Sequence, residues 1–122
     1  MSELVTIQKN GKLNEVYSLG DVGPGGAKHE YMIVARRENA EREKICTIQF
    51  QKGPRYEPGS VVGVCDQDLL EIVRDRLRGF TNGDMPTRET AIALTHVENA
   101  LLWLNKRIED RITRGVLGTM EK

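Results

Sequence analysis

The hydrophobic and polar positions of the chain follow two different periods, and the change falls near residue 65. Residues 28–37 and 44–51 alternate apolar with polar side chains, as half-buried strands do, and the charged segment "RENAERE" lies between them. Upstream, the runs "LVTIQ" and "NEVYSL" flank Asn10-Gly11, a pair typical of hairpin turns. The pattern predicts antiparallel β structure in residues 4–64, with residues 52–64 as a structured connector.

From Asp66 onward the apolar residues recur at helical spacing. A stripe that ends at Phe80 predicts a short helix over residues 66–79, with Asp66 as its N-cap and Gly79 as its stop. Phe80 is then expected in the Gly-rich turn that follows. Either it closes the apolar stripe of the short helix, or it offers a flat ring to a ligand.

A second and longer helix is predicted from near Thr87 to about Thr113, where Gly115 ends it. Its apolar seam has coiled-coil-like spacing and consists of Leu94, Val97, Leu101, Leu104, Ile108 and Ile112. The short helix is only about half as long. The far half of the long helix must therefore be covered by the sheet, by another subunit, or by both.

These elements predict an α+β protein with a small N-terminal antiparallel β-sheet followed by a C-terminal antiparallel two-helix hairpin. We expect one domain over residues 1–122, with a sheet part (1–64) and a hairpin part (65–122). Aromatic residues make up only 5% of the chain, which leaves a thin core and favours a homo-oligomer.

The composition argues against duplex nucleic acid and membranes as partners and indicates a cellular compartment. The formal net charge is zero, so binding to duplex nucleic acid by charge alone is not expected. No apolar run approaches the ~20 residues of a membrane span. Cys46 and Cys65 are interpreted as buried thiols in a reducing compartment, and a cytoplasmic protein without membrane contact is predicted.

The sequence carries no HExxH, CxxC, P-loop or Ser/His/Asp arrangement, so we predict neither a metal nor a cofactor. The Gly23–Gly26 run is either a turn that needs positive φ angles or a loop whose N–H groups approach an anion. On the long helix, Arg107, Arg111 and Arg114 form one stripe beside the apolar seam. They either form ion pairs on a solvated face or bind phosphate and stack on a base.

Thr90 is a small polar residue on the seam side of the long helix, where an apolar residue is expected. It lies 17 positions before Arg107, which is roughly 25 Å along a straight helix. A nucleotide is shorter than this. If both residues serve one ligand, the pocket must be shared between antiparallel subunits.

Several motifs carry a resemblance over nearly the whole chain. They are "DRLRGF", "RETAIALT", "ALLWLNKR" and "RGVLGT", preceded by "SLGDVGPGGAKHEYMIV" and "TIQFQKGPRYEPG". The chain resembles the phage-encoded signal-sponge family, in particular its Thoeris anti-defence branch, which shares a helical hairpin with the anti-CBASS sponge. The family pattern usually reads RENAIAL, so Thr90 stands where an Asn is usual.

The resemblance implies a non-enzymatic protein that sequesters cyclic nucleotide immune signals in the cytoplasm of a bacterial host, encoded by a phage or prophage. The ligands implied are glycocyclic ADP-ribose isomers, and some members of the family also hold cyclic di- or trinucleotides in a separate pocket of a hexamer. By the same resemblance, Phe80 stacks on adenine opposite Arg107, and Arg111 and Arg55 contact phosphate and ribose. The other implied ligand contacts are Asp21, Ala27, Lys28, His29 and Thr90, with Arg88 at the second pocket.

Two other classes of function remain open from the residues. One is an enzyme that cleaves cyclic ADP-ribose, which requires a general acid or base such as His29 or Asp21. The other is a structural phage protein that oligomerises through its helix seam. The oligomer expected ranges from a dimer to a hexamer.

Overall fold

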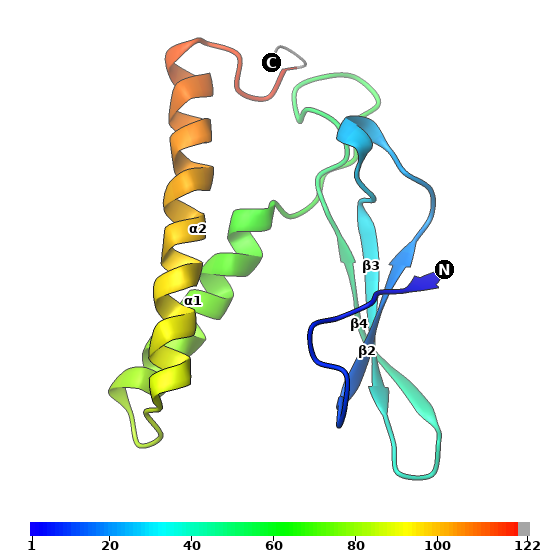
Figure 1. Ribbon diagram of the computed structural model, residues 1–122. Helices are drawn as coiled ribbons and strands as arrows, with labels where there is room; N and C mark the ends of the chain where they lie inside the picture. Colours follow the sequence, from blue (N-terminus) through cyan, green and yellow to red (C-terminus); the bar gives the residue numbers. More distant parts are fainter. Residues whose placement is uncertain (120–122) are drawn as a thin grey trace. The chain divides into compact units, whose positions relative to one another are not determined.

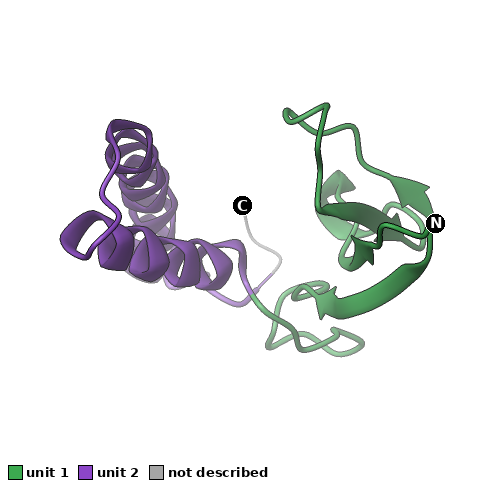
Figure 2. Cartoon of the chain, turned by 90° about the horizontal axis from the view of Figure 1, so that it is seen from below, with its two compact units in different colours: residues 1–64 green, residues 65–122 purple. Residues whose placement is uncertain are grey.

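A computed structural model describes residues 1–119 of the chain, in two compact units (Figures 1 and 2). The first unit ends at Val64 and the second begins at Cys65. The first holds a four-stranded sheet and the second holds two α-helices, so the α+β class is confirmed. That both parts act as a single domain stays a prediction.

The sheet is antiparallel throughout, with its strands in chain order. Its strands are β1 (Ser2–Glu3), β2 (Asn14–Leu19), β3 (Glu30–Arg36) and β4 (Arg42–Gln49). Ile33 of the central β3 pairs with Val16 on one side and with Cys46 on the other. Among residues 1–119 the only buried apolar side chain is Val34, so this sheet has very little core of its own.

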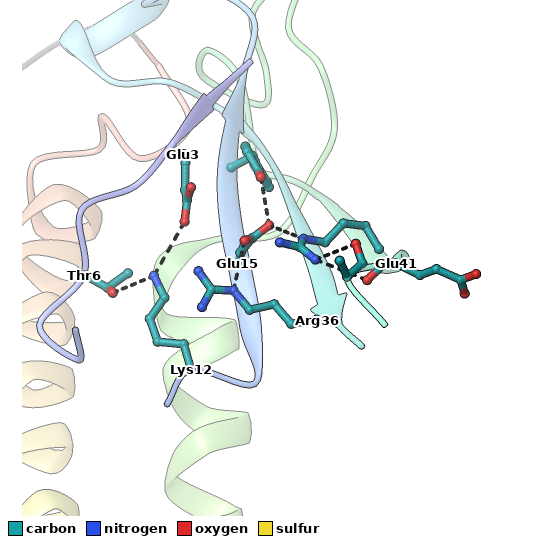
Figure 3. Close-up of polar contacts among 9 residues, drawn as sticks. Glu3, Thr6, Lys12, Glu15, Arg36 and Glu41 are labelled. Atoms are coloured by element: carbon teal, nitrogen blue, oxygen red, sulfur yellow. Dashed lines mark hydrogen bonds and ion pairs between the residues drawn. The ribbon is translucent and has the colours of Figure 1, made fainter. Parts of the chain in front are cut away.

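The predicted first hairpin is wrong in its first strand. The strand β1 holds only Ser2 and Glu3, the Leu4 N–H adds one bond to the Val16 carbonyl at 2.8 Å, and the run Val5–Ile7 lies in the loop before β2. Val5 and Ile7 are fully exposed, so their β-branched side chains have no surface to pack on within the unit. The loop is held instead by Lys12, whose ammonium group contacts Glu3 at 3.7 Å and the Thr6 hydroxyl at 3.1 Å (Figure 3).

A buried carboxylate fastens three strands of the sheet together (Figure 3). Glu15 of β2 accepts hydrogen bonds from the Nε atoms of Arg36 (2.9 Å) and Arg42 (3.0 Å) and from the Tyr17 hydroxyl (2.9 Å). The hydrogen bonds from Arg42 and Tyr17 are the main cause that lowers the pKa of Glu15 to about 2. The hydrogen bond from Tyr17 to Glu15 also raises the pKa of Tyr17, because the phenol donates to an anion.

Residues 50–64 form the structured connector that the sequence predicts. Phe50 and Val64 form a parallel bridge, and Lys52 and Val61 form an antiparallel one. Gly63 lies so close to β4 that an added Cβ would be 2.4 Å from the Gln49 carbonyl oxygen. Any larger residue at this position would push the connector away from the sheet.

The helical unit is a hairpin of α1 (Asp66–Asn82) and α2 (Arg88–Thr113) (Figure 1). The Thr87 side chain caps α2 by accepting from the Thr90 N–H at 3.0 Å, which confirms the predicted start of the long helix. The seam of α2 is half-buried from Leu94 to Ile108, whereas Ile112 is exposed. Neither helix contains a residue that is fully buried within the described chain.

The predicted ends of α1 are wrong by a few residues at the C-terminus and by one at the N-terminus. Gly79 does not stop the helix, so Phe80 lies within α1 and not in a turn. The helix continues because an internal glycine costs only about 1 kcal/mol and the chain turns instead at Gly83, whose N–H bonds to the Phe80 carbonyl. At the other end the N-cap is Cys65, whose N–H donates to Asp68.

The structure also bears on the two cysteines and on membrane-spanning helices. Cys46 and Cys65 are free thiols, but both are half-buried and not fully buried. No helix in residues 1–119 is long and apolar enough to cross a membrane.

The Glu15 network predicts a pH dependence of sheet stability. Because the folded state lowers the pKa of Glu15, its stabilising effect is fully present above the ordinary pKa of a glutamate and is lost as the pH falls towards 2. Glu15→Gln should lower the free energy of unfolding of the sheet at pH 7, and the values for wild type and variant should converge near pH 2. Amide hydrogen exchange of β2 and β3 measures this. Glu38→Gln, in the exposed turn after β3, is the control and should have little effect at any pH.

Candidate functional site

The predicted ligand residues are divided between the two units. In the sheet unit, Asp21, Ala27, Lys28 and His29 belong to the loop between β2 and β3, which contains a short 3-10 turn (Pro24–Gly26). The Gly23 N–H donates to the Ala27 carbonyl at 2.8 Å and closes the loop. Gly25 and Gly26 both have positive φ angles, so these glycines serve the turn.

The His29 side chain contacts two residues of this loop, Pro24 and Gly23. Its Nε2 atom lies 2.9 Å from the Pro24 carbonyl oxygen, and a carbonyl only accepts, so Nε2 carries the proton. A Cβ on Gly23 would lie 2.9 Å from the His29 ring, so the ring packs directly on the glycine backbone. Lys28 donates to the Ser18 hydroxyl at 3.2 Å, whereas Asp21 and Ala27 are exposed. The loop is therefore pre-folded, and Asp21 and Ala27 are exposed on it.

Arg55 binds within its own connector. Its Nε and Nη2 atoms donate to Gln51 Oε1 at 2.9 and 2.7 Å, and Nη2 also donates to the Gly63 carbonyl at 2.8 Å. Within residues 1–119 its Nη1 group makes no hydrogen bond, and the residue is exposed. The guanidinium is thus fixed through Nε and Nη2, and the two N–H groups of Nη1 are left as donors for an anion.

Phe80 is an exposed aromatic residue of the helical unit and lies in the last turns of α1. The side chain is 44% exposed, and the guanidinium carbon of Arg76 lies 5.3 Å from the ring centroid. Arg76 precedes Phe80 by one helical turn, a spacing that sequence reasoning could have recognised. The cation lies over the ring, and nearly half of the residue is exposed to solvent.

Thr90 has a structural task at the start of α2. Its hydroxyl accepts from the Thr87 hydroxyl at 2.8 Å, while its N–H makes the capping bond to the same oxygen. This pair accounts for a polar residue at a seam position. The capping bond uses the backbone of Thr90, so a different side chain at this position leaves it intact.

The arginines of α2 differ in their contacts. Arg111 is half-buried and donates through Nη2 to the carbonyls of Val116 (2.9 Å) and Thr119 (3.1 Å), so it shapes the chain after the helix. Arg114 pairs with Asp110 at 3.4 Å, as expected for a solvated face. Arg88 and Arg107 are exposed and form no ion pair within the described part of the chain.

The candidate residues of the hairpin lie at its two ends. Phe80, Arg88 and Thr90 flank the turn between the helices, whereas Arg107 and Arg111 lie near the opposite end of α2. Thr90 and Arg107 are about 25 Å apart along the helix axis. One copy of the hairpin therefore cannot bring Phe80 and Arg107 onto the same base.

Sequence reasoning missed a groove between the helices. An open groove of about 560 Å³ lies along the N-terminal half of α1 and is lined by Gln67, Asp68, Glu71, Arg74, Glu98, Leu101, Leu102, Asn105 and Ile108. Across it Arg74 donates to Glu98 at 2.8 Å and to Glu71 at 3.3 Å, and the bond to Glu98 is the main cause that raises the pKa of Arg74. The pairing joins α1 to α2 and satisfies the groove's only arginine.

Comparison with known proteins supports the resemblance inferred from the motifs. The family model for the Acb2/Tad1 hairpin domain matches residues 42–109, from β4 through most of α2. A relative from Bacillus phage SBSphiJ7, named "Thoeris anti-defense 1", is 48% identical over 79 residues, which are 65% of this chain and 55% of that protein. The match thus spans about half of the relative's length. Because the family model covers more than half of the chain, the protein belongs to the Acb2/Tad1 hairpin-domain family.

Proposed function

We propose that the protein is a phage anti-defence sponge, which binds a cyclic nucleotide immune signal in the host cytoplasm and keeps it intact. The observation that carries this proposal is the relative named for Thoeris anti-defence, at 48% identity. The ligand class we propose is a glycocyclic ADP-ribose isomer. Phe80 supports it, because a half-exposed ring backed by a guanidinium is suited to stack on a purine.

The proposed pocket uses donors that are already fixed. Arg55 and Arg111 are each held by carbonyl or amide oxygens of their own unit, so they lose little side-chain entropy when a phosphate or ribose binds. Arg107 carries the guanidinium that faces the base from the side opposite Phe80. The loop with Asp21, Ala27, Lys28 and His29 closes over the ligand.

The pocket requires more than one copy of the chain. Phe80 and Arg107 lie at opposite ends of the hairpin, so a shared site needs antiparallel partners. We propose a homo-oligomer between a dimer and a hexamer, and in the larger assembly Arg88 contributes to a second pocket for cyclic di- or trinucleotides. A purely structural role in oligomerisation is the second candidate, favoured by the exposed apolar residues of both helices.

The first prediction concerns the fate of the ligand. A glycocyclic ADP-ribose isomer mixed with excess protein should disappear from an ultrafiltrate and return with unchanged mass after heat denaturation, because the pocket holds the ring without attacking it. Liquid chromatography with mass spectrometry measures both steps. A linear or deribosylated product would instead establish a cleaving enzyme, and full recovery in the first filtrate would favour the structural role.

The second prediction concerns Phe80. Removing the ring by Phe80→Ala should weaken binding by roughly 10- to 100-fold, since base stacking on an aromatic side chain contributes about 1–3 kcal/mol. Phe80→Trp should retain the affinity. Met85→Ala, which removes another exposed apolar side chain near the hairpin turn, is the matched control. Calorimetric titration measures all three, and equal affinities for Phe80→Ala and Met85→Ala would argue against the stacking role.

The third prediction concerns Thr90. Thr90→Asn should tighten binding of the same isomer by roughly 2- to 10-fold, because an amide offers a donor and an acceptor on separate atoms, whereas the Thr90 hydroxyl is one group whose oxygen already accepts from Thr87. The capping bond of α2 runs through the backbone N–H and should survive. An unchanged melting temperature checks the cap, and unchanged or weaker affinity would show that position 90 does not contact the ligand.

A further inference from the structure

The arginines of the chain divide into two kinds by the atoms that hold them. Within residues 1–119, the arginines that donate to carboxylates are Arg36, Arg37, Arg42, Arg74 and Arg114. Arg55 and Arg111 instead donate only to neutral oxygens, which belong to one side-chain amide and to backbone carbonyls. A carboxylate fixes a guanidinium and also cancels its charge, whereas a neutral oxygen fixes it and leaves the charge in place.

The position of Arg55 depends on the side chain of Gln51. The single atom Gln51 Oε1 accepts from Arg55 Nε at 2.9 Å, from Arg55 Nη2 at 2.7 Å and from the Gly63 N–H at 3.2 Å. The amide nitrogen of Gln51 donates to the Gly53 carbonyl at 3.0 Å, which fixes the orientation of the amide, because a carbonyl only accepts. Both polar atoms of the Gln51 side chain are therefore engaged within the connector.

These bonds determine which donors of Arg55 remain available. The Nε–H and one Nη2–H point to Gln51, and Nη2 also donates to the Gly63 carbonyl at 2.8 Å. Nη1 makes no hydrogen bond within residues 1–119, and Arg55 is exposed. Because the charge of a guanidinium is delocalised over its three nitrogens, Nη1 still carries a share of it. The partner that this group lacks is an anionic oxygen.

A contact that served only the stability of the connector would favour a carboxylate at position 51. Hydrogen bonds to a charged acceptor are roughly twice as strong as those to a neutral one. The sheet of the same unit uses a carboxylate in this way, since Glu15 holds both Arg36 and Arg42. An amide at position 51 gives a weaker contact and leaves Arg55 with a net positive charge, which is useful only if an anion binds there.

We propose that Gln51 is a positioning residue of the ligand site, which orients Arg55 and, because it is neutral, preserves the positive charge that binds a phosphate group. The inference rests on the proposed function, in which Arg55 contacts the ligand. Gln51 acts through Arg55, since its own polar atoms are already bonded to Arg55, Gly63 and Gly53. The ligand chemistry that it selects is an anionic oxygen placed at Nη1.

The orientation of Arg55 is tested first, without ligand. In full-length protein, the Nε–H of Arg55 should exchange with water at least roughly tenfold more slowly than that of Arg78, which is exposed and forms no hydrogen bond within residues 1–119. Gln51→Met removes the acceptor and should bring the two rates together, whereas Gln51→Glu should keep Arg55 slow. Nitrogen-15 NMR of the arginine side chains measures these rates. Equal rates for Arg55 and Arg78 in the wild type would overturn the proposal.

The charge is tested by calorimetric titration with a glycocyclic ADP-ribose isomer. Gln51→Met should weaken binding roughly 2- to 10-fold, because a mobile Arg55 must be ordered when the ligand binds. Gln51→Glu should weaken binding roughly 3- to 30-fold at low salt, and less at high salt, because the carboxylate cancels the charge of Arg55. Gln8→Glu, which adds the same charge on the exposed loop before β2, is the matched control and should bind like the wild type. Equal affinities for Gln51→Glu and Gln8→Glu would overturn the proposal.

A double-mutant cycle separates positioning from a structural role. In an Arg55→Ala background, Gln51→Met should cause no further loss of affinity, because Gln51 acts through the missing guanidinium. An equal loss in both backgrounds would show that Gln51 acts through the Gly63 N–H and the shape of the connector, which would overturn the proposal. Melting curves check that Gln51→Met folds. Gln51→Glu retains the acceptor oxygen, so it tests the charge even if Gln51→Met unfolds.

A second probe separates this inference from the proposed function. Inorganic pyrophosphate carries the phosphates without the base or the ribose, and the same variants are titrated with it. Pyrophosphate binding that follows the Gln51 variants, without binding of the isomer, would retain the role of Gln51 and overturn the proposed function. Binding of the isomer that ignores the Gln51 variants would do the reverse. A wild-type protein that binds neither probe would overturn both.

Discussion

The constraint on which the rest depends is that two long helices bury no complete side chain within the chain. α2 has 26 residues and α1 has 17, so α2 extends roughly 14 Å beyond what α1 can cover. An isolated helical pair with only a half-buried seam gains little from the hydrophobic effect, since most helix stability in proteins comes from packing an apolar face. The exposed Ile72, Leu102 and Trp103 are therefore surface that an assembly can bury.

This constraint connects folding with binding. A sponge of the kind proposed above would compete with the host receptor by affinity alone, which favours groups that are in place before the ligand arrives. Arg55, Arg111 and His29 are each fixed by bonds to carbonyl or amide oxygens of their own unit. The remaining requirement is to bring the two ends of the hairpin together. The antiparallel association proposed above would meet this requirement.

The sequence predicted the elements well wherever a local signal determines them. Pro86 and the Thr87 cap mark the start of α2, and its period is long enough to be unambiguous. The end of α1 was misplaced because Gly79 resembles a stop, although helix packing tolerates it and the chain turns at Gly83. The run Val5–Ile7 has β-branched residues but no apolar partner, so propensity alone did not make it a strand.

The motifs identified the candidate residues, but they could not predict which atoms those residues contact. That Arg55 reaches the Gly63 carbonyl, or that Arg111 turns back to Val116, depends on how loops fold around a side chain. Periodicity carries no such information.

The central claim, that two copies share each binding cavity, is tested most directly by mixing two defective proteins. Phe80→Ala and Arg107→Ala should each bind glycocyclic ADP-ribose weakly. A dimer with one copy of each has one intact site, which takes Phe80 from one subunit and Arg107 from the other. After unfolding and refolding together in equal amounts, the mixture should regain high-affinity sites at roughly a quarter of the wild-type number. A mixture that binds no better than either variant alone would contradict the account.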